Sequence, residues 1–219
     1  MAESSGHETE NQGGSSAQNS TRTEPNPQNT SNQAGLAKLV WTPAAGQRLR
    51  LTLDQDAGDT DTEVYSARTT TVMPAGPGAT STIRVQDLDG EDHQERNRVQ
   101  LDYEFEHVLP GVDAGLFQVY SQDSETEQKT FESRQTTTVS PRGTVVAPAR
   151  RFREFSFDQD AQGAELTMAS AFQTGAAGHY LSYGLEWTET DTAQRRDGSA
   201  TNLTTGVSTS VVIPDVFPV

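Results

Sequence analysis

Three acidic residues at alternate positions come closest to the side-chain arrangement of an active site. Asp102, Glu104 and Glu106 stand at i, i+2 and i+4, so in an extended chain they point to one side, with neighbours about 6.5 to 7 Å apart. Two carboxylates at this spacing could act as acid and base on either side of a glycosidic bond. The alternative, which we favour, is the solvated face of a strand in a strongly acidic protein.

The run from Val99 to Glu106 is similar to the acidic strand of jelly-roll glycoside hydrolases, in which paired acids lie on a concave face. It lacks the Glu-aliphatic-Asp-x-x-Glu order of that strand. Two Trp and five Tyr also provide few aromatic side chains for a sugar groove. A jelly-roll protein that binds or hydrolyses glycans is therefore kept as an alternative.

Other kinds of active site lack their sequence signatures. The chain contains no cysteine, which excludes thiolate nucleophiles, thiolate zinc sites and disulfides. It has no G-x-S-x-G elbow, P-loop or dinucleotide fingerprint, and its four histidines form no H-x-H or H-x-x-x-H pair. We expect a protein that is not an enzyme, with no catalytic residue and no cofactor.

Acidic residues in predicted loops suggest a hard cation such as Ca²⁺, which prefers several converging oxygen ligands. The stretches that start at Asp87 and Asp158 begin with D-x-D like an EF-hand loop, but their twelfth residues are Arg98 and Ala169 in place of glutamate. We expect hydrated carboxylates, with a structural Na⁺, K⁺ or Ca²⁺ ion as the alternative. The candidate ligands are Asp54, Asp56, Asp87, Asp89, Asp158 and Asp160.

The charged residues are typical of a protein adapted to high salt. Asp and Glu number 31 against 16 basic residues, the net charge is −15, and only Lys38 and Lys129 are lysines. In molar salt the Debye length falls to about 3 Å, so this charge no longer opposes a compact fold. An ordinary acidic protein is the alternative, although such chains usually contain many lysines.

Arginines stand close together at Arg150, Arg151 and Arg153, just before Phe155. Because Arg can bind a carboxylate through two hydrogen bonds, we predict salt-resistant subunit contacts here, and a further contact at Phe217 near the C-terminus. Contact of the arginines with lipid phosphate or DNA is the weaker alternative.

From Leu36 onward, apolar and polar residues alternate with the period of β-strands. The clearest runs are Val99 to Glu106 and His179 to Trp187. Further runs lie at 49–53, 69–72, 82–85, 116–120, 136–139, 152–157, 166–172 and 207–213. Turn residues separate them at 74–78, 89–90, 110–111, 141–143 and 197–198. Glu91 to Arg98 allows at most one or two helical turns.

This pattern predicts an all-β fold, namely an antiparallel β-sandwich over residues 35–213 that is wired as a single jelly roll. Residues 1–34 hold no large aliphatic or aromatic side chain after Met1, so we expect a disordered polar arm. Residues 214–219 form a C-terminal tail. Arg22 is the only Arg or Lys of the arm, so we expect no direct nucleic-acid binding.

Size, composition and architecture together resemble the single jelly-roll major capsid proteins of haloarchaeal icosahedral viruses with an internal membrane. The resemblance implies capsomers built from this chain and a related capsid protein, in contact with the viral membrane. A turret, spike or tail subunit is the alternative within the same class. The polar N-terminus also predicts no signal peptide, and no apolar run is long enough to span a bilayer, so we expect assembly into virions in the host cytoplasm.

Overall fold

The computed structural model describes residues 2–5, 15–212, 215–216 and 218. Most of these residues are in β-strands, and the only helical element among them is the 3₁₀ turn η1 (Tyr65–Ala67). The strands are β1 (Ala2–Ser5), β2 (Gln28–Trp41), β3 (Gln47–Glu63), β4 (Thr70–Pro74), β5 (Thr80–Glu106), β6 (Ala114–Ser140), β7 (Gly143–Thr174), β8 (Ala177–Asn202), β9 (Ser208–Thr209), β10 (Val211–Val212) and β11 (Asp215–Val216).

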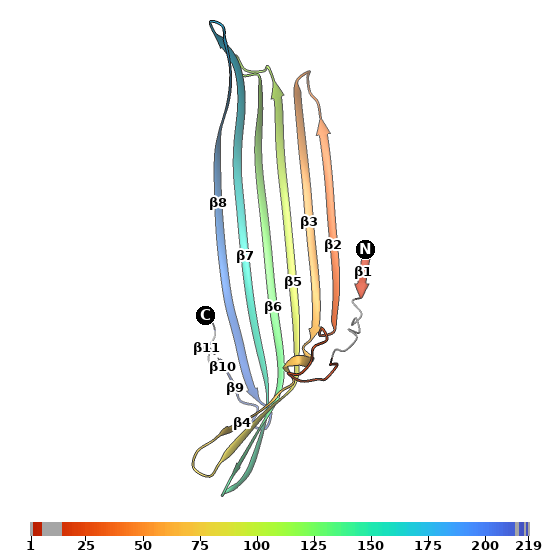
Figure 1. The fold of residues 1–219 in the computed structure, drawn as a ribbon, viewed down its shortest axis with the longest axis vertical. Coiled ribbons are helices and arrows are strands. Elements are labelled where there is room, and N and C mark those ends of the chain that lie inside the picture. The colour runs from red at the N-terminus through yellow and green to blue at the C-terminus, as the bar shows by residue number, and fades with distance from the viewer. Residues whose placement is uncertain (1, 6–14, 213–214, 217, 219) are drawn as a thin grey trace.

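The strands form one long antiparallel sheet in sequence order. The order is β1-β2-β3-β5-β6-β7-β8-β9, β4 pairs with the lower part of β5, and β10 pairs with β11 in a separate hairpin. Figure 1 shows the long strands side by side in a tall single layer, from which the lower hairpins bend away. An irregularity in the register between Val85 and Asp87 lies in the lower part of β5.

The predicted all-β antiparallel fold is confirmed. The second layer of a sandwich and the jelly-roll wiring are not confirmed, because the large sheet follows the sequential order of a meander. Runs that the sequence predicts as separate strands are joined here, since 82–85 and 99–106 are the two ends of the 27-residue strand β5.

The predicted turns are only partly correct. Gly76, Gly111 and Gly143 adopt positive φ angles in the turns at 74–78, 110–111 and 141–143, as expected. The turns at Asp89-Gly90 and Asp197-Gly198 are wrong, because these residues continue β5 and β8 with partners in the neighbouring strands. The helical turn allowed at 91–98 is also wrong, for the same reason.

The N-terminal region contributes to the sheet earlier than predicted. Strand β2 begins at Gln28 because residues 28–34, assigned to the arm, find antiparallel partners along β3. Before it, Arg22 donates to the carbonyl oxygens of Ser16 (3.0 Å) and Pro25 (2.7 Å) and lies over the ring of Tyr65. Ala2–Ser5 of the predicted arm also join the sheet, as strand β1 beside β2. Residues 1 and 6–14 of the arm lie outside the described residues.

The single-layer sheet of the described residues has almost no hydrophobic core. Among the described residues, the buried hydrophobic side chains are Phe105 and Val212. Aromatic rings cover glycines across strands instead: a Cβ at Gly115 would lie 2.2 Å from the Phe105 ring, and one at Gly163 would lie 2.6 Å from the Tyr120 ring. No helix in the described part of the chain is long and apolar enough to cross a membrane.

Candidate assembly surfaces

The upper half of one side of the sheet is apolar. Directly paired residues of an antiparallel sheet point to the same side, so the strand register defines rows that cross all six long strands. One row contains Trp41, Leu49, Tyr103, Phe117, Leu166 and Leu185, and the next row on that side contains Leu39, Leu51, Leu101, Val119, Ala164 and Trp187. We call this side of the sheet the apolar face and the opposite side the polar face.

Much of the apolar face is open to solvent. Leu185 is 75% exposed, Leu39 67%, Trp41 61% and Trp187 52%, and all four lie on the two outermost long strands, β2 and β8. Phe117 and Leu101 on the inner strands are also exposed. Soluble monomers rarely expose a contiguous apolar patch of this kind, and larger patches mark interaction sites.

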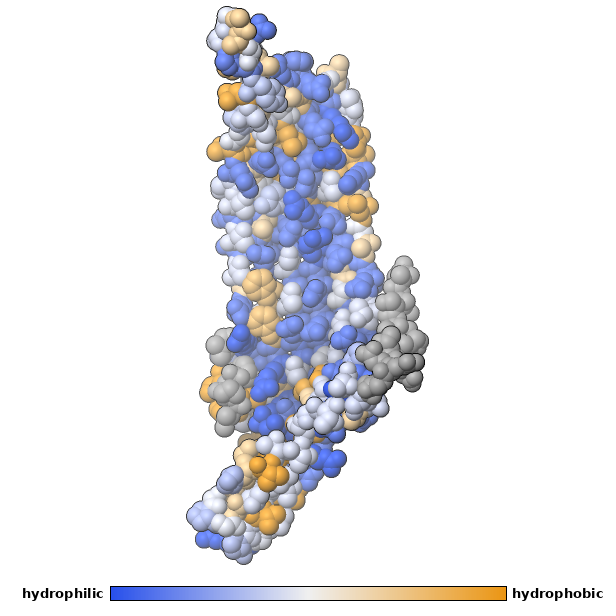
Figure 2. Space-filling view, viewed as in Figure 1, coloured by the Kyte–Doolittle hydropathy of each residue, from blue (hydrophilic) through white to orange (hydrophobic). Residues whose placement is uncertain are grey.

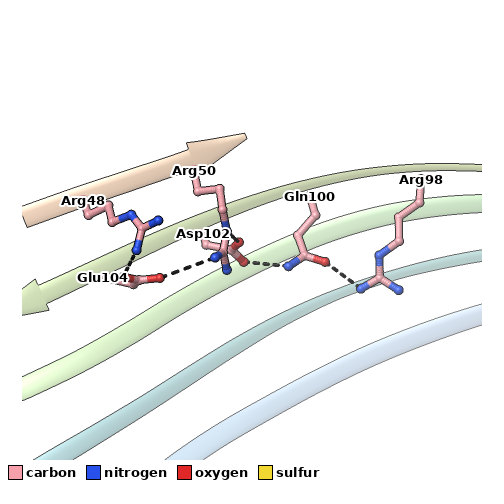
Figure 3. Close-up of polar contacts among 6 residues, drawn as sticks. All are labelled: Arg48, Arg50, Arg98, Gln100, Asp102 and Glu104. Atoms are coloured by element: carbon pink, nitrogen blue, oxygen red, sulfur yellow. Dashed lines mark hydrogen bonds and ion pairs between the residues drawn. The ribbon is translucent and has the colours of Figure 1, made fainter. Parts of the chain in front are cut away.

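The polar face carries a chain of hydrogen bonds and ion pairs, shown in Figure 3. Arg50 Nε donates to Asp102 Oδ2 at 2.8 Å, and Gln100 donates to the other carboxylate oxygen at 2.7 Å. Arg98 donates to Gln100 at 2.9 Å, while Glu104 lies 3.4 Å from Arg48 and 3.8 Å from Arg50. Figure 2 shows that this face is mainly hydrophilic over the middle of the sheet.

Burial makes the Arg50 and Asp102 pair the strongest part of this network. The side chain of Asp102 is 1% exposed, whereas Arg50 keeps a third of its surface in water. The hydrogen bond and the charge of Asp102 raise the pKa of Arg50. Of the three acids with the spacing of a glycosidase pair, Asp102 and Glu104 are therefore both bound by arginines. The third, Glu106, stands at the exposed end of β5.

Replacing Arg50 with methionine is expected to lower the free energy of unfolding by about 3 kcal/mol, because a buried carboxylate loses its ionic partner. The matched control is Arg48→Met, which breaks a pair whose side chains are 48% and 39% exposed and should cost less than about 1 kcal/mol. Urea unfolding in high salt measures both values. Equal losses would contradict the structural role of the Arg50 pair.

The six candidate metal ligands lie in strands rather than in loops. Asp54 and Asp56 point to the polar face of β3, where Asp54 pairs with Arg96 at 3.1 Å. Asp87 and Asp89 of β5 and Asp158 and Asp160 of β7 point to the other side of the sheet. Within the described residues, no three metal-binding side chains are placed to hold an ion.

Asp87 and Asp89 lie in a hollow lined by further acids and by Arg68, which pairs with Asp87. Burial, together with the carboxylates of Asp87 and Glu63, raises the pKa of Asp89, against the opposite effect of Arg68. The folded state therefore binds a proton at Asp89 more tightly than the unfolded state does. The resulting stabilisation is complete below the unfolded pKa and is lost as the pH rises through the folded pKa.

Asp89→Asn is accordingly expected to stabilise the protein at pH 7, by about 0.5 kcal/mol, and to have no effect at a pH where Asp89 is protonated in both states. Asp92→Asn removes the same charge from the opposite side of β5 and serves as the control. Thermal unfolding at the two pH values measures the difference. An equal gain from both variants would assign the effect to net charge instead of burial.

The predicted contact arginines lie at the lower end of β7. Arg151 and Arg153 share one side of the strand and Arg150 points to the other, following the alternation of β7. Burial, and then the charges of Arg134 and Arg153, lower the pKa of Arg151, while Glu132 acts in the opposite direction. Phe217 lies outside the described residues. The intersubunit role of these residues stays a prediction.

The outer edge of the sheet was not predicted from the sequence. Strand β2 was not predicted, although Leu39 and Trp41 alternate with Lys38 and Val40 in the manner of a strand. Along its outer side, β2 is paired only with β1, at Asn29–Asn32, and β8 only with β9, at Ala200 and Thr201, in the described residues. The upper parts of both edges therefore carry unpaired backbone groups.

A scan against protein-family models and a search of curated proteins both find no match for this chain.

Proposed function

We propose that this chain is a structural subunit that assembles with copies of itself into the shell of a salt-adapted virion, as a major capsid protein. The observation that carries the proposal is the incomplete burial of a single copy. One face of its sheet exposes Leu39, Trp41, Leu185 and Trp187, and among the described residues no strand pairs with the upper parts of the two outer long strands. Assembly would bury this surface and pair these edges.

The charged residues fit the same role. Arg48 and Arg50 bind the acids of the polar face within the chain, and arginine pairs of this kind hold better than lysine pairs where salt is high. The resemblance to capsid proteins adds a related capsid protein and the internal viral membrane as proposed partners.

The test is the mass of the purified protein in about 3 M NaCl, by light scattering, followed as the salt is diluted. We expect a discrete oligomer or larger particle in high salt that dissociates on dilution, and electron microscopy of that particle should show closed shells. A protein that stays monomeric at all salt concentrations would overturn the proposal. Cleavage of a polysaccharide panel would favour the glycan-active alternative.

A further inference from the structure

The two outermost long strands of the sheet, β2 and β8, run in opposite directions, because neighbouring long strands alternate in direction from β2 to β8. A second copy in the same orientation would therefore place its β2 antiparallel to the β8 of the first copy. The alternation within one subunit then continues across the boundary. Figure 1 shows these two strands at opposite sides of the sheet.

In the described part of the chain, the short terminal strands β1 and β9 pair only with the lower parts of β2 and β8, so the upper part of each edge strand is available for pairing. On β2, β1 occupies Asn29–Asn32, and no strand of the described residues pairs with the outer side of 33–41. On β8, β9 occupies Ala200 and Thr201, at the lower end. Following the cross-strand pairs from β2 to β8 shows which residues lie at the same height. Residue 33 of β2 shares a row with residue 193 of β8, and residue 41 shares a row with residue 185. Two copies at the same height therefore present free segments of equal length to each other.

Backbone hydrogen bonds place the donors and acceptors of both edges in matching positions. Glu63 donates to the carbonyl of Pro27 at 3.0 Å, so the odd-numbered residues of β2 direct their polar backbone groups toward β3. Leu203 donates to Pro148 at 2.9 Å, so the odd-numbered residues of β8 direct theirs toward β7. Even-numbered residues of both strands point outward and can bond to one another.

Side chains favour the same alignment. It sets Leu39 beside Trp187 and Trp41 beside Leu185, which extends the rows of the apolar face from one copy to the next. The charges of the two segments are also complementary: residues 33–41 contain Lys38 and no acid, whereas residues 185–193 contain three acids and no basic residue. Pairing β8 with β8 would instead bring the acids of two copies together.

We propose that residues 33–41 of one copy pair antiparallel with residues 193–185 of the next copy, so that the sheet continues between subunits. The contact is head-to-tail, and such contacts repeat into a ring or an open filament. This inference rests on the proposed function and adds the partner surface: a second copy of this chain, bound at a defined register.

Cysteine cross-linking tests the register, and the chain has no native cysteine to interfere. Ala37 and Glu189 are paired in the proposed ladder at a position without hydrogen bonds, where the Cβ atoms of antiparallel strands come closest. The double variant Ala37→Cys with Glu189→Cys is oxidised in about 3 M NaCl and separated on a non-reducing gel. We expect a ladder of multimers that reductant removes.

Matched variants make the result specific. Each single variant should give no cross-linked species, because a head-to-tail contact never joins identical positions. Ala37→Cys with Asp191→Cys and Gly35→Cys with Glu189→Cys sample a shift of two residues in the two directions, and a Cβ at Gly35 meets no other atom within 4 Å. Both pairs should cross-link at least about fivefold less, because they are diagonal neighbours. Dimers from a single variant, or a stronger ladder from a shifted pair, would overturn the proposed register.

Light scattering on the same samples separates this proposal from the proposed function. Particles that form in high salt but give no multimer ladder from any pair would overturn the edge contact and leave the capsid proposal standing. Protein that remains monomeric before oxidation would overturn both. Circular dichroism confirms that each variant keeps its strand content.

Discussion

Trp187→Glu is expected to abolish assembly while each copy stays folded. Trp187 is 52% exposed in one copy, so its replacement removes little packing within the subunit. Between copies it would lie beside Leu39, and a carboxylate there meets an apolar side chain and joins an edge that already carries Glu186, Glu189 and Asp191. Because the proposed assembly also covers the apolar face, the new carboxylate would lose water there without a partner, which costs several kcal/mol, so we expect at least about a hundredfold weaker association.

Tyr180→Glu is the matched control for this prediction. Tyr180 is an aromatic residue of the same strand and is 74% exposed, but it lies on the polar face and beyond the proposed ladder. Light scattering in high salt should give monomers for Trp187→Glu and wild-type particles for Tyr180→Glu, with unchanged circular dichroism in both. Normal assembly of Trp187→Glu would remove β8 from the interface.

Local patterns in the sequence were enough to predict the strands that have one apolar side. The alternation of Val99, Leu101, Tyr103 and Phe105 needs no knowledge of partners, because period two alone places these residues on one side. The same reasoning cannot predict residues 28–34, which are polar on both sides and become a strand only because β3 lies beside them. Register and strand length depend on such distant partners.

The single layer could not be predicted for a related reason. An apolar side of a strand indicates that something covers it, and the sequence suggested a second sheet of the same chain as the cover. Within a single copy of the protein, most of that apolar surface is not covered by other residues, and Phe105 is the exception.

The ion pair of Arg50 and Asp102 could not be predicted from the sequence either, because its two residues are 52 positions apart and meet only through the register of β3 and β5.

Lowering the salt is expected to unfold the protein, with a midpoint below about 1 M NaCl. The structure shows where the repulsion is concentrated. Asp123, Asp160 and Asp191 are direct cross-strand partners in one row, and Glu95, Glu125 and Asp158 form the neighbouring row on the same side. Like charges directly opposite each other destabilise a sheet, and five of these six carboxylates line one hollow without a basic residue.

Asp160→Asn tests this origin of the salt requirement, because Asp160 is the middle carboxylate of its row. We expect the midpoint of salt-dependent unfolding to fall by about a third, since the substitution removes two cross-strand repulsions of roughly 0.2 to 1 kcal/mol each. The control is Asp54→Asn, which makes the same change in net charge but removes the partner of Arg96 and should not lower the midpoint. Circular dichroism across a salt titration measures both. Full stability of the wild-type protein in dilute buffer would refute the salt adaptation, and equal shifts for the two variants would assign it to net charge rather than to these rows.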